Sequence, residues 1–440
     1  MFKFDFQVEE DENDQSHITF ETSPAQAQAG PSTLPKTSET EGDTNCYHIT
    51  LDELVKFLPE EISYSPITLP PPSKPLLRRD LFDARFQLYN RPDPTSFHIN
   101  NGTGDRSTEP GQGQDTDDGE EYVDAQTDLI PGLYEGGLKS WEGGVDLVEV
   151  ISSVGDDEAV ASWASGARIL EVGCGTALPT IYILRSLLAS SSASVQSHGH
   201  KGKTILHLQD YNSLVLSLVT LPNLLLAAIP FLPTEALHAP ADDEDVESIL
   251  PDLENAGQLV ITPTLIEAFK GLLESRNVEL RFTYGHWSGL AKDLRSGNQW
   301  RGEGGHGEGK GGGEGEGEEG YDLVLTAETI YAEDNNASLL SVLREAVRTR
   351  RGEGQEGIVQ KEEVKLEDSL GELKVVDEWK SRPLREQGEG FVLIAAKILY
   401  FGVGGGLTAF LNQVEESKGW WKDVKQWTKG VGRKVVQVGW

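Results

Sequence analysis

The stretch ARILEVGCGTALPTIYILRSLL, residues 167–188, predicts a β-strand, a tight turn and an α-helix in that order. Its first part, residues 167–172, is a short apolar run rich in branched side chains, which is typical of a strand. Gly173-Cys174-Gly175 interrupts this run, and from Ala177 onward the apolar residues recur at helical spacing. Because glycine lets a backbone approach a ligand closely, the turn is a candidate nucleotide site.

The same alternation of strand and helix continues along the chain. Strands are predicted at residues 168–172, 204–208, 279–284, 322–326 and 391–396. Helices are predicted at residues 145–154, 178–188, 214–229, 264–275, 337–347 and 407–414. This order indicates an α/β fold in which right-handed crossovers place helices on both faces of a mostly parallel sheet. Residues 435–438 are expected to form a closing strand at the edge of the sheet.

Composition divides the chain at about residue 120. Residues 1–120 are expected to be an acidic, largely disordered N-terminal region with short helical and proline-rich elements. One such element is a helix within residues 47–57, where Thr50 and Glu53 have the spacing of a capping box. Residues 121–440 are expected to form one domain. Polar, acidic or glycine-rich insertions, which we expect to be disordered, interrupt it near residues 190–203, 239–254, 298–320 and 352–387.

Charge and cysteine content exclude several classes of protein. The formal net charge of −34 argues against nucleic-acid binding, because phosphates are neutralised by clustered Lys and Arg. Only two cysteines are present, and Cys174 lies inside the glycine turn, so a disulfide with Cys46 is not expected. The apolar stretch at residues 214–233 is about long enough to span a bilayer. Because Pro222 interrupts it and flanking Lys and Arg are missing, we expect a buried helix instead.

The ligand of the glycine turn can be narrowed by elimination. A P-loop requires a Lys after the glycines, and none is present. A dinucleotide fingerprint requires a third glycine where Leu178 stands. The remaining pattern, acid-x-Gly-x-Gly from Glu171 to Gly175, together with Asp210 at the end of the second strand, indicates S-adenosylmethionine. One acid would hold the ammonium or an adjacent water, and the other would accept hydrogen bonds from the ribose hydroxyls.

Five further stretches resemble a known family, the seven-β-strand protein-histidine N-methyltransferases that modify a large-subunit ribosomal protein. They are YEGGLKSWEGG (134–144), LQDYNSLVLSLVTLPN (208–223), GHWSGL (285–290), YDLVLTAETIY (321–331) and KILYFGVGGG (397–406). QDYN and YFGVGGG are the specific parts of this match, whereas EVGCG fits any class I methyltransferase. The resemblance implies a class I, Rossmann-like, seven-stranded methyltransferase with S-adenosylmethionine as cofactor and no metal ion.

The resemblance also implies which residues contact the cofactor. They are Lys139, Ser140, Trp141 and Glu142 before the first strand, Glu171, Gly173 and Gly175 at the turn, Asp210, Tyr211 and Asn212 after the second strand, His286 and Trp287 after the third, and Thr326 and Ala327 with Glu328 at the end of the fourth. Two departures are evident. Ala177 stands where a third glycine is common, and Gly143-Gly144 replaces the Cys-Thr of the family.

The resemblance implies direct transfer of the sulfonium methyl group to an imidazole nitrogen. Neutral histidine is largely available near pH 7, so alignment rather than a strong base is the main requirement. A hydrogen bond to one ring nitrogen leaves the lone pair of the other facing the methyl group. The candidate acceptors of that hydrogen bond, which we take as the catalytic residues, are Glu328, Asn212, Tyr331 and Tyr400.

Two alternatives remain open from the residues alone. The spacing from Glu328 to Tyr331 resembles the acid-x-x-Tyr motif of related protein-lysine methyltransferases, which would need an acid near the methyl group for the same reason. A cofactor-binding ribosome-assembly factor without transferase activity is the second, because an acidic chain suits a basic ribosomal protein. In each case we expect a monomeric, cytoplasmic and nuclear protein that binds a protein partner and no membrane.

Overall fold

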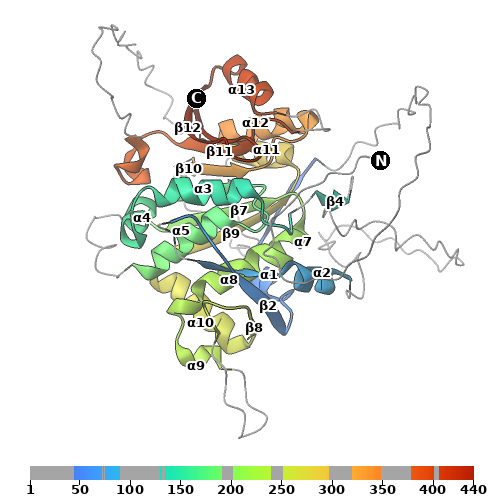
Figure 1. Cartoon of the computed structure of the whole chain (residues 1–440), viewed down its shortest axis with the longest axis vertical. Coiled ribbons are helices and arrows are strands. Elements are labelled where there is room, and N and C mark those ends of the chain that lie inside the picture. Colours follow the sequence, from blue (N-terminus) through green and yellow to red (C-terminus); the bar gives the residue numbers. More distant parts are fainter. Residues whose placement is uncertain are drawn as a thin grey trace, which may run out of the picture. The chain divides into compact units, whose positions relative to one another are not determined.

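A computed structural model of the chain describes residues 44–71, 73, 75–89, 129, 130, 134, 135, 137–190, 202–238, 251–296, 320–347, 378–400 and 406–440 (Figure 1). The insertions that were expected to be disordered lie mostly outside these residues, as does the glycine-rich run 402–405. Two parts of them are described. Residues 251–254 lead into a strand, and the short helices η3 (Glu378–Lys380) and η4 (Leu384–Glu386) end the insertion expected at 352–387.

An eight-stranded sheet forms the centre of the fold, in the order β1-β9-β7-β6-β10-β11-β13-β12. The strands are β1 (Cys46–Ile49), β6 (Arg168–Val172), β7 (Thr204–Asp210), β9 (Val278–Gly285), β10 (Leu323–Ala327), β11 (Phe391–Lys397), β12 (Trp420–Trp427) and β13 (Arg433–Gly439). β9, β7, β6, β10 and β11 are parallel, so their carboxyl ends meet at one edge. The predicted mostly parallel, seven-stranded sheet is therefore confirmed, with β1 added antiparallel to β9.

Helices cover both faces of this sheet (Figure 1). They include α3 (Glu142–Ser152), α4 (Asp157–Ala164), α5 (Leu178–Ala189), α9 (Thr234–Leu237), α10 (Pro263–Ser275), α11 (Trp287–Ser296), α12 (Glu333–Val347) and α13 (Leu407–Glu416). Two apolar clusters show the layering. Ile169 packs with residues of α3, α5 and α10, whereas its neighbour Leu170 packs with residues of α11, α12 and α13. Successive strand residues point to opposite faces, so the two clusters lie on opposite sides of the sheet.

The apolar stretch that could have spanned a membrane is a core helix. It consists of α7 (Ser213–Val215), the π-helical segment η1 (Leu216–Thr220), α8 (Leu221–Ala228) and the 3₁₀ segment η2 (Ile229–Phe231). Ser213–Phe231 is long and apolar enough to cross a bilayer, yet 83% of its most apolar window is buried within the described protein. The predicted buried helix is thus observed. Among the described residues, no other helix meets the same length and hydropathy criteria.

A buried arginine fixes this helix to the N-terminal region. Pro222 has no N–H, so it cannot donate to the carbonyl of Leu218, four residues earlier in the helix. Arg79 Nη1 donates to that carbonyl at 2.8 Å instead. The Arg79 guanidinium also donates to Asp83 and Gln87, which places it in a polar cage beneath the helix. The buried arginine therefore supplies a donor to the carbonyl that the proline leaves without its usual helical partner.

The N-terminal region is more ordered than expected. β1, α1 (Leu51–Val55), β2 (Glu61–Ile67), β3 (Leu76–Arg79) and α2 (Leu81–Tyr89) lie within it, and β8 (Gly257–Val260) completes a second sheet of order β3-β2-β8. The capping box of Thr50 and Glu53 is confirmed, but the helix that it begins is preceded by a strand. β1 and β8 pair with partners distant in sequence, and β2 pairs with β3 across the proline-rich residues 69–75, so local composition underestimates their order. A third, two-stranded sheet joins β4 (Leu129–Ile130) and β5 (Tyr134–Glu135).

The predicted C-terminal edge strand is wrong in one respect. Residues 435–438 lie in β13, which is paired on both sides, with β11 and β12. β12 forms the edge instead. It mixes four polar residues with tryptophans, including the exposed Trp420 and Trp421, and polar edge residues of this kind hide a strand from a search for apolar runs.

Candidate active site

The glycine turn follows β6 in a backbone conformation that favours glycine. Gly173 has φ +63° and Gly175 has φ +50°. A Cβ atom on Gly173 would lie 2.6 Å from Thr329 Cγ2, so the turn also lacks room for a side chain. Ala177 has φ 54° and is fully buried, which explains why a third glycine is common in the resembled family at this position. An L-residue in this conformation carries strain of about 1–2 kcal/mol, which the fold tolerates.

Glu171 is a buried carboxylate that caps the helix after the turn. Its Oε2 accepts a hydrogen bond from Thr180 N at 3.1 Å and another from the Thr180 hydroxyl. α5 has no other side-chain cap at its start, because its N-cap residue is Ala177. Burial raises the pKa of Glu171 to about 8 despite the two hydrogen bonds. The group is therefore not the exposed strand-end acid that is the simplest alternative to a binding role.

Asp210 ties the end of β7 to the glycine turn. Its Oδ2 accepts from Gly175 N at 2.9 Å, and its Oδ1 accepts from Asn212 N at 3.3 Å. Burial raises the pKa of Asp210 to about 6. Asn212 in turn accepts from Leu214 N at 2.9 Å and caps α7. The structure thus brings Asp210 and Asn212 to the turn, as expected for cofactor-binding residues.

Three aromatic side chains gather beyond the ends of β7 and β9. The Tyr211 ring lies 5.4 Å from His286 and 5.1 Å from Trp287, centroid to centroid, edge-on to both. Tyr211 is partly exposed and Trp287 is buried. This cluster offers an apolar wall of the kind that accepts a planar base. The residues predicted to flank adenine are therefore adjacent in the structure.

The segment before α3 crosses the turn from the other side. A Cβ atom on Gly175 would lie 3.2 Å from Gly137 O, which shows how closely the two backbones approach. Ser140 Oγ donates to Thr176 Oγ1 at 3.1 Å. Residues 139–142 consequently lie beside the turn although they precede it by some thirty positions.

A second group of predicted residues meets at the carboxyl ends of β10 and β11. The Tyr400 hydroxyl donates to Glu328 Oε2 at 2.6 Å and accepts from Lys397 N at 3.2 Å. Glu328 Oε1 is buried and has no hydrogen-bond partner among the described residues. Glu328 also has φ 57°, a conformation that is uncommon for a residue with a side chain. A free acceptor oxygen and a strained backbone at a strand end are typical of a functional site.

Charged groups of α3 and β11 surround this carboxylate. Lys397 Nζ lies 3.6 Å from Glu142 Oε2 and 5.4 Å from the centre of the Trp141 ring, and Lys139 Nζ lies 5.5 Å from the same ring. Burial raises the pKa of Glu328, while Tyr400 and Lys397 oppose that rise. Lys397 was not among the predicted residues, although it begins one of the five resembling stretches.

Not every predicted residue faces these groups with its side chain. Thr326 is fully buried, and its hydroxyl donates to Val172 O at 2.9 Å and is 2.7 Å from Thr329 Oγ1. It therefore holds the ends of β10 and β6 together, and its side chain does not line a surface. Ala327 and Tyr331 are partly buried beside Glu328 in sequence. Asn212 belongs to the Asp210 side of the site, where it forms hydrogen bonds with Asp210 and Leu214.

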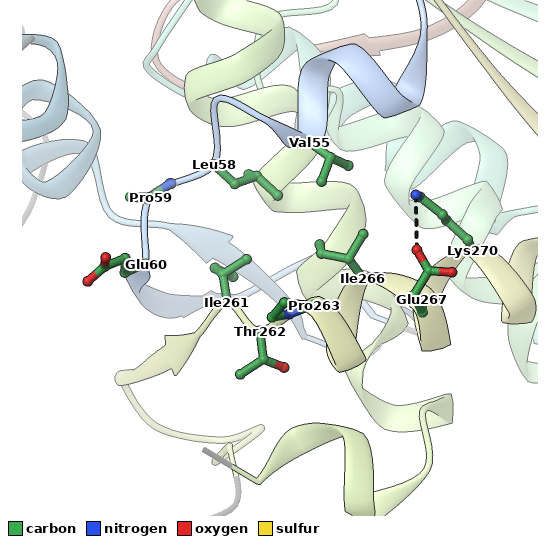
Figure 2. A pocket seen from close by; sticks show the side chains of 10 residues that line it. All are labelled: Val55, Leu58, Pro59, Glu60, Ile261, Thr262, Pro263, Ile266, Glu267 and Lys270. Atoms are coloured by element: carbon green, nitrogen blue, oxygen red, sulfur yellow. Dashed lines mark hydrogen bonds and ion pairs between the residues drawn. The ribbon is translucent and has the colours of Figure 1, made fainter. Parts of the chain in front are cut away.

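One surface pocket lies elsewhere on the fold. Figure 2 shows it between the connection from α1 to β2 and the beginning of α10, with Val55, Leu58, Ile261 and Ile266 among its lining residues. Lys270 pairs there with Glu267 at 3.2 Å. None of the residues that line it is a predicted site residue, so it is separate from the constellation at the strand ends.

The raised pKa of Glu171 predicts a pH dependence of stability. A carboxyl group with a raised pKa holds its proton more tightly in the folded state, so its stabilising contribution is full below about pH 4 and is lost as the pH rises through about 8. Glutamine at this position still accepts from Thr180 but does not ionise. Urea unfolding of the ligand-free protein at pH 5.5 and 8.5 should therefore show Glu171→Gln gaining stability relative to the wild type at the higher pH. If the difference in unfolding free energy between Glu171→Gln and the wild type were the same at pH 5.5 and pH 8.5, this account would be contradicted.

Fold and site together define a class of enzyme. A sheet of this strand order, with a glycine cradle and two carboxylates at the carboxyl ends of its parallel strands, makes the chain a class I S-adenosylmethionine-dependent methyltransferase. Histidine protein methyltransferase 1 of Saccharomyces cerevisiae is 30% identical over 342 residues, which cover 77% of this chain and 68% of the yeast protein. The chain belongs to the histidine protein methyltransferase 1 family.

Two further relatives carry the name of the same family. The Schizosaccharomyces pombe protein of that name is 25% identical, covering 88% of this chain and 83% of its own length, and a Bos taurus homologue is 27% identical, covering 66% and 52%. No family model matches the chain. Among solved structures, a putative methyltransferase from Streptococcus mutans gives a TM-score of 0.31 at 10% identity, covering 69% of this chain and 50% of its own. The O-methyltransferase TomG from Streptomyces achromogenes in complex with SAM gives a TM-score of 0.26 at 11% identity, covering 68% of this chain and 91% of its own. These likenesses are weak, and the fold assignment rests on the strand order.

Proposed function

We propose that the protein transfers the methyl group of S-adenosylmethionine to an imidazole nitrogen of a histidine in a large-subunit ribosomal protein. The observation that carries the proposal is the buried Oε1 of Glu328, which has no hydrogen-bond partner within the described part of the chain, beside the Tyr400 hydroxyl. The bound cofactor supplies an electrophilic methyl group on a sulfonium centre. The glycine turn, Asp210 and the aromatic cluster are the residues that would hold it.

Glu328 is suited to orient a neutral imidazole. Its Oε2 is already engaged by Tyr400, so the free Oε1 can accept the N–H of one ring nitrogen and leave the lone pair of the other directed at the methyl carbon. A new nitrogen–carbon bond forms as the carbon–sulfur bond breaks, and the N–H proton can pass to Glu328. Lys397 favours the ionised carboxylate that this role requires. Alignment of this kind contributes on the order of 7–11 kcal/mol to catalysis when the geometry is good.

The ribosomal substrate is supported by charge. A chain with a formal net charge of −34 is attracted to a basic partner, and ribosomal proteins are basic. The family resemblance supports the same class of substrate. Lysine is the rival acceptor, because a free carboxylate oxygen beside the methyl group could equally take a proton from an ammonium group.

The test is to incubate the protein with labelled cofactor and large-subunit ribosomal proteins from cells that lack this gene, followed by amino-acid analysis. We expect label on histidine in one basic protein, and none when Glu328→Gln replaces the wild type. Label on lysine alone would exclude the proposal and favour the lysine methyltransferase. Cofactor binding by calorimetry without any transfer would favour an assembly factor.

A further inference from the structure

We propose that Gln209 is a positioning residue of the cofactor site. Its side-chain amide sets the glycine turn and the Trp287 indole in the arrangement that accepts the adenosine half of S-adenosylmethionine. Gln209 is the penultimate residue of β7, between β6 and β9, and it is fully buried. Because it is fully buried, it acts through the groups that it holds.

The amide makes three hydrogen bonds, one to the glycine turn and two to the corner between β9 and α11. Oε1 accepts from Gly173 N at 3.2 Å and from Trp287 Nε1 at 3.0 Å. Nε2 donates to Gly285 O at 3.1 Å. Two of the partners are donors and the third is an acceptor, so only one orientation of the amide satisfies all three. The side chain is thus specified in both position and orientation.

Each partner belongs to a wall of the adenosine site. Gly173 is in the glycine turn, and Trp287 begins α11 with its ring edge-on to Tyr211. Gly285 has φ +107°, and its N–H donates to Tyr211 O at 3.1 Å. One amide therefore bonds the turn after β6 to the corner between β9 and α11, and the Gly285 N–H bonds that corner to the residue after β7. These are the segments that we expect to contact the adenosine half of the cofactor.

The chemistry of the amide explains why another residue would not serve. An apolar side chain would leave the Trp287 N–H buried without an acceptor, and the ring would rotate to find one. The Gly173 N–H would also lose its side-chain acceptor in the middle of the glycine turn. Both changes act on the adenosine end of the ligand, and neither alters the groups around Glu328.

The test compares Gln209→Met with a matched control in the same sheet. Gln437 lies buried in β13, and its Oε1 has no partner among the described residues, so Gln437→Met removes a similar buried amide outside the site. Calorimetric titrations of the full-length protein would use S-adenosylmethionine and methylthioadenosine, which lacks the amino-acid moiety. We expect Gln209→Met to weaken both ligands by the same factor, about 10- to 100-fold, and Gln437→Met to change either by less than about threefold.

A second variant separates positioning from loss of structure. Gln209→Glu can reproduce all three bonds when its carboxyl is protonated, because the carbonyl oxygen accepts and the hydroxyl donates. At each pH, the affinity of Gln209→Glu for the cofactor is divided by that of the wild type. This ratio should be closer to one at pH 5.5 than at pH 8. Equal binding by Gln209→Met and wild type, or a loss for S-adenosylmethionine without a loss for methylthioadenosine, would overturn the proposal. If Gln209→Met is unfolded by circular dichroism, a pH-independent defect in Gln209→Glu would overturn it. No acceptor is involved, so the outcome is independent of which residue is methylated.

Discussion

Replacing Glu328 with glutamine is expected to lower kcat by about 10²- to 10⁴-fold while leaving the Kd of S-adenosylmethionine within about threefold. The amide oxygen would still accept from Tyr400, so the NH₂ group would take the place of the free Oε1. It would then present a donor to the N–H of the substrate imidazole, which also needs an acceptor. Methyl transfer to the protein substrate and calorimetry with the cofactor alone measure the two quantities separately.

Tyr400→Phe is the graded control for this result. It removes the hydroxyl that holds Oε2 but keeps the carboxylate, so we expect a smaller loss of kcat, on the order of tenfold. Because ionised Glu328 is the active form and burial raises its pKa, the wild-type rate should also fall as the pH is lowered. If Glu328→Gln retained kcat within about threefold of the wild type, the role assigned to this carboxylate would be wrong.

Gly173→Ala is expected to weaken cofactor binding by at least about 100-fold and to destabilise the fold by about 2–4 kcal/mol. Two costs combine at this position. The backbone has φ +63°, and the added Cβ would meet Thr329 Cγ2 at 2.6 Å. The turn would then have to open, which breaks the hydrogen bonds of Gly173 N and Gly175 N and removes the close backbone approach that we expect the ligand to need. Calorimetry with the cofactor and urea unfolding of the ligand-free protein measure the two effects.

Two further variants separate these costs. Gly430 has φ +71° with no atom within 4 Å of the added Cβ, so Gly430→Ala carries backbone strain alone, about 1–2 kcal/mol, and should leave the cofactor Kd unchanged. Thr329→Ser deletes the methyl group that the new Cβ would meet and keeps the hydroxyl that lies 2.7 Å from Thr326. The double variant Gly173→Ala/Thr329→Ser should therefore bind the cofactor more tightly than Gly173→Ala alone. If Gly173→Ala bound the cofactor as tightly as the wild type, the glycine turn would not be the cofactor site.

Local patterns were sufficient to predict the centre of the fold. The parallel strands are continuous apolar runs separated by helical periodicity, and both signals are contained within short windows. β1 and β8 escaped prediction because their pairing partners are distant in sequence, whereas β2 and β3 pair with each other across a proline-rich stretch that reads as a linker. β8, for example, pairs with β2 across some 190 residues, and nothing local marks either as a strand. β12 escaped because an edge strand with polar residues has no apolar run.

The site divides in the same way. Glu171, Asp210 and Glu328 were predictable because an acid at the end of a parallel strand falls at the common binding edge whatever the detailed packing. The burial of the Thr326 side chain was not predictable, because the choice between lining a surface and lying beneath it depends on which side of the strand end a side chain points. Gln209 and Lys397 did not stand out as candidates. An amide in a strand and a lysine at its end carry no chemical signature until their partners are in place.

The backbone of the buried Arg79 links the N-terminal region to the glycine turn through one side-chain amide. Arg79 N donates to Asn223 Oδ1 at 2.8 Å, and the same amide donates to Thr176 O at 3.1 Å beside the glycine turn. If docking of this region stabilises the turn that the ligand requires, ligand binding stabilises the docked region by the same free energy, since thermodynamic linkage is reciprocal. We therefore expect the cofactor to protect the backbone amides of β3 and α2 from hydrogen exchange, and unchanged exchange there would show that the two regions are not coupled. Part of the segment that composition marks as a tail is thus connected to the glycine turn by hydrogen bonds.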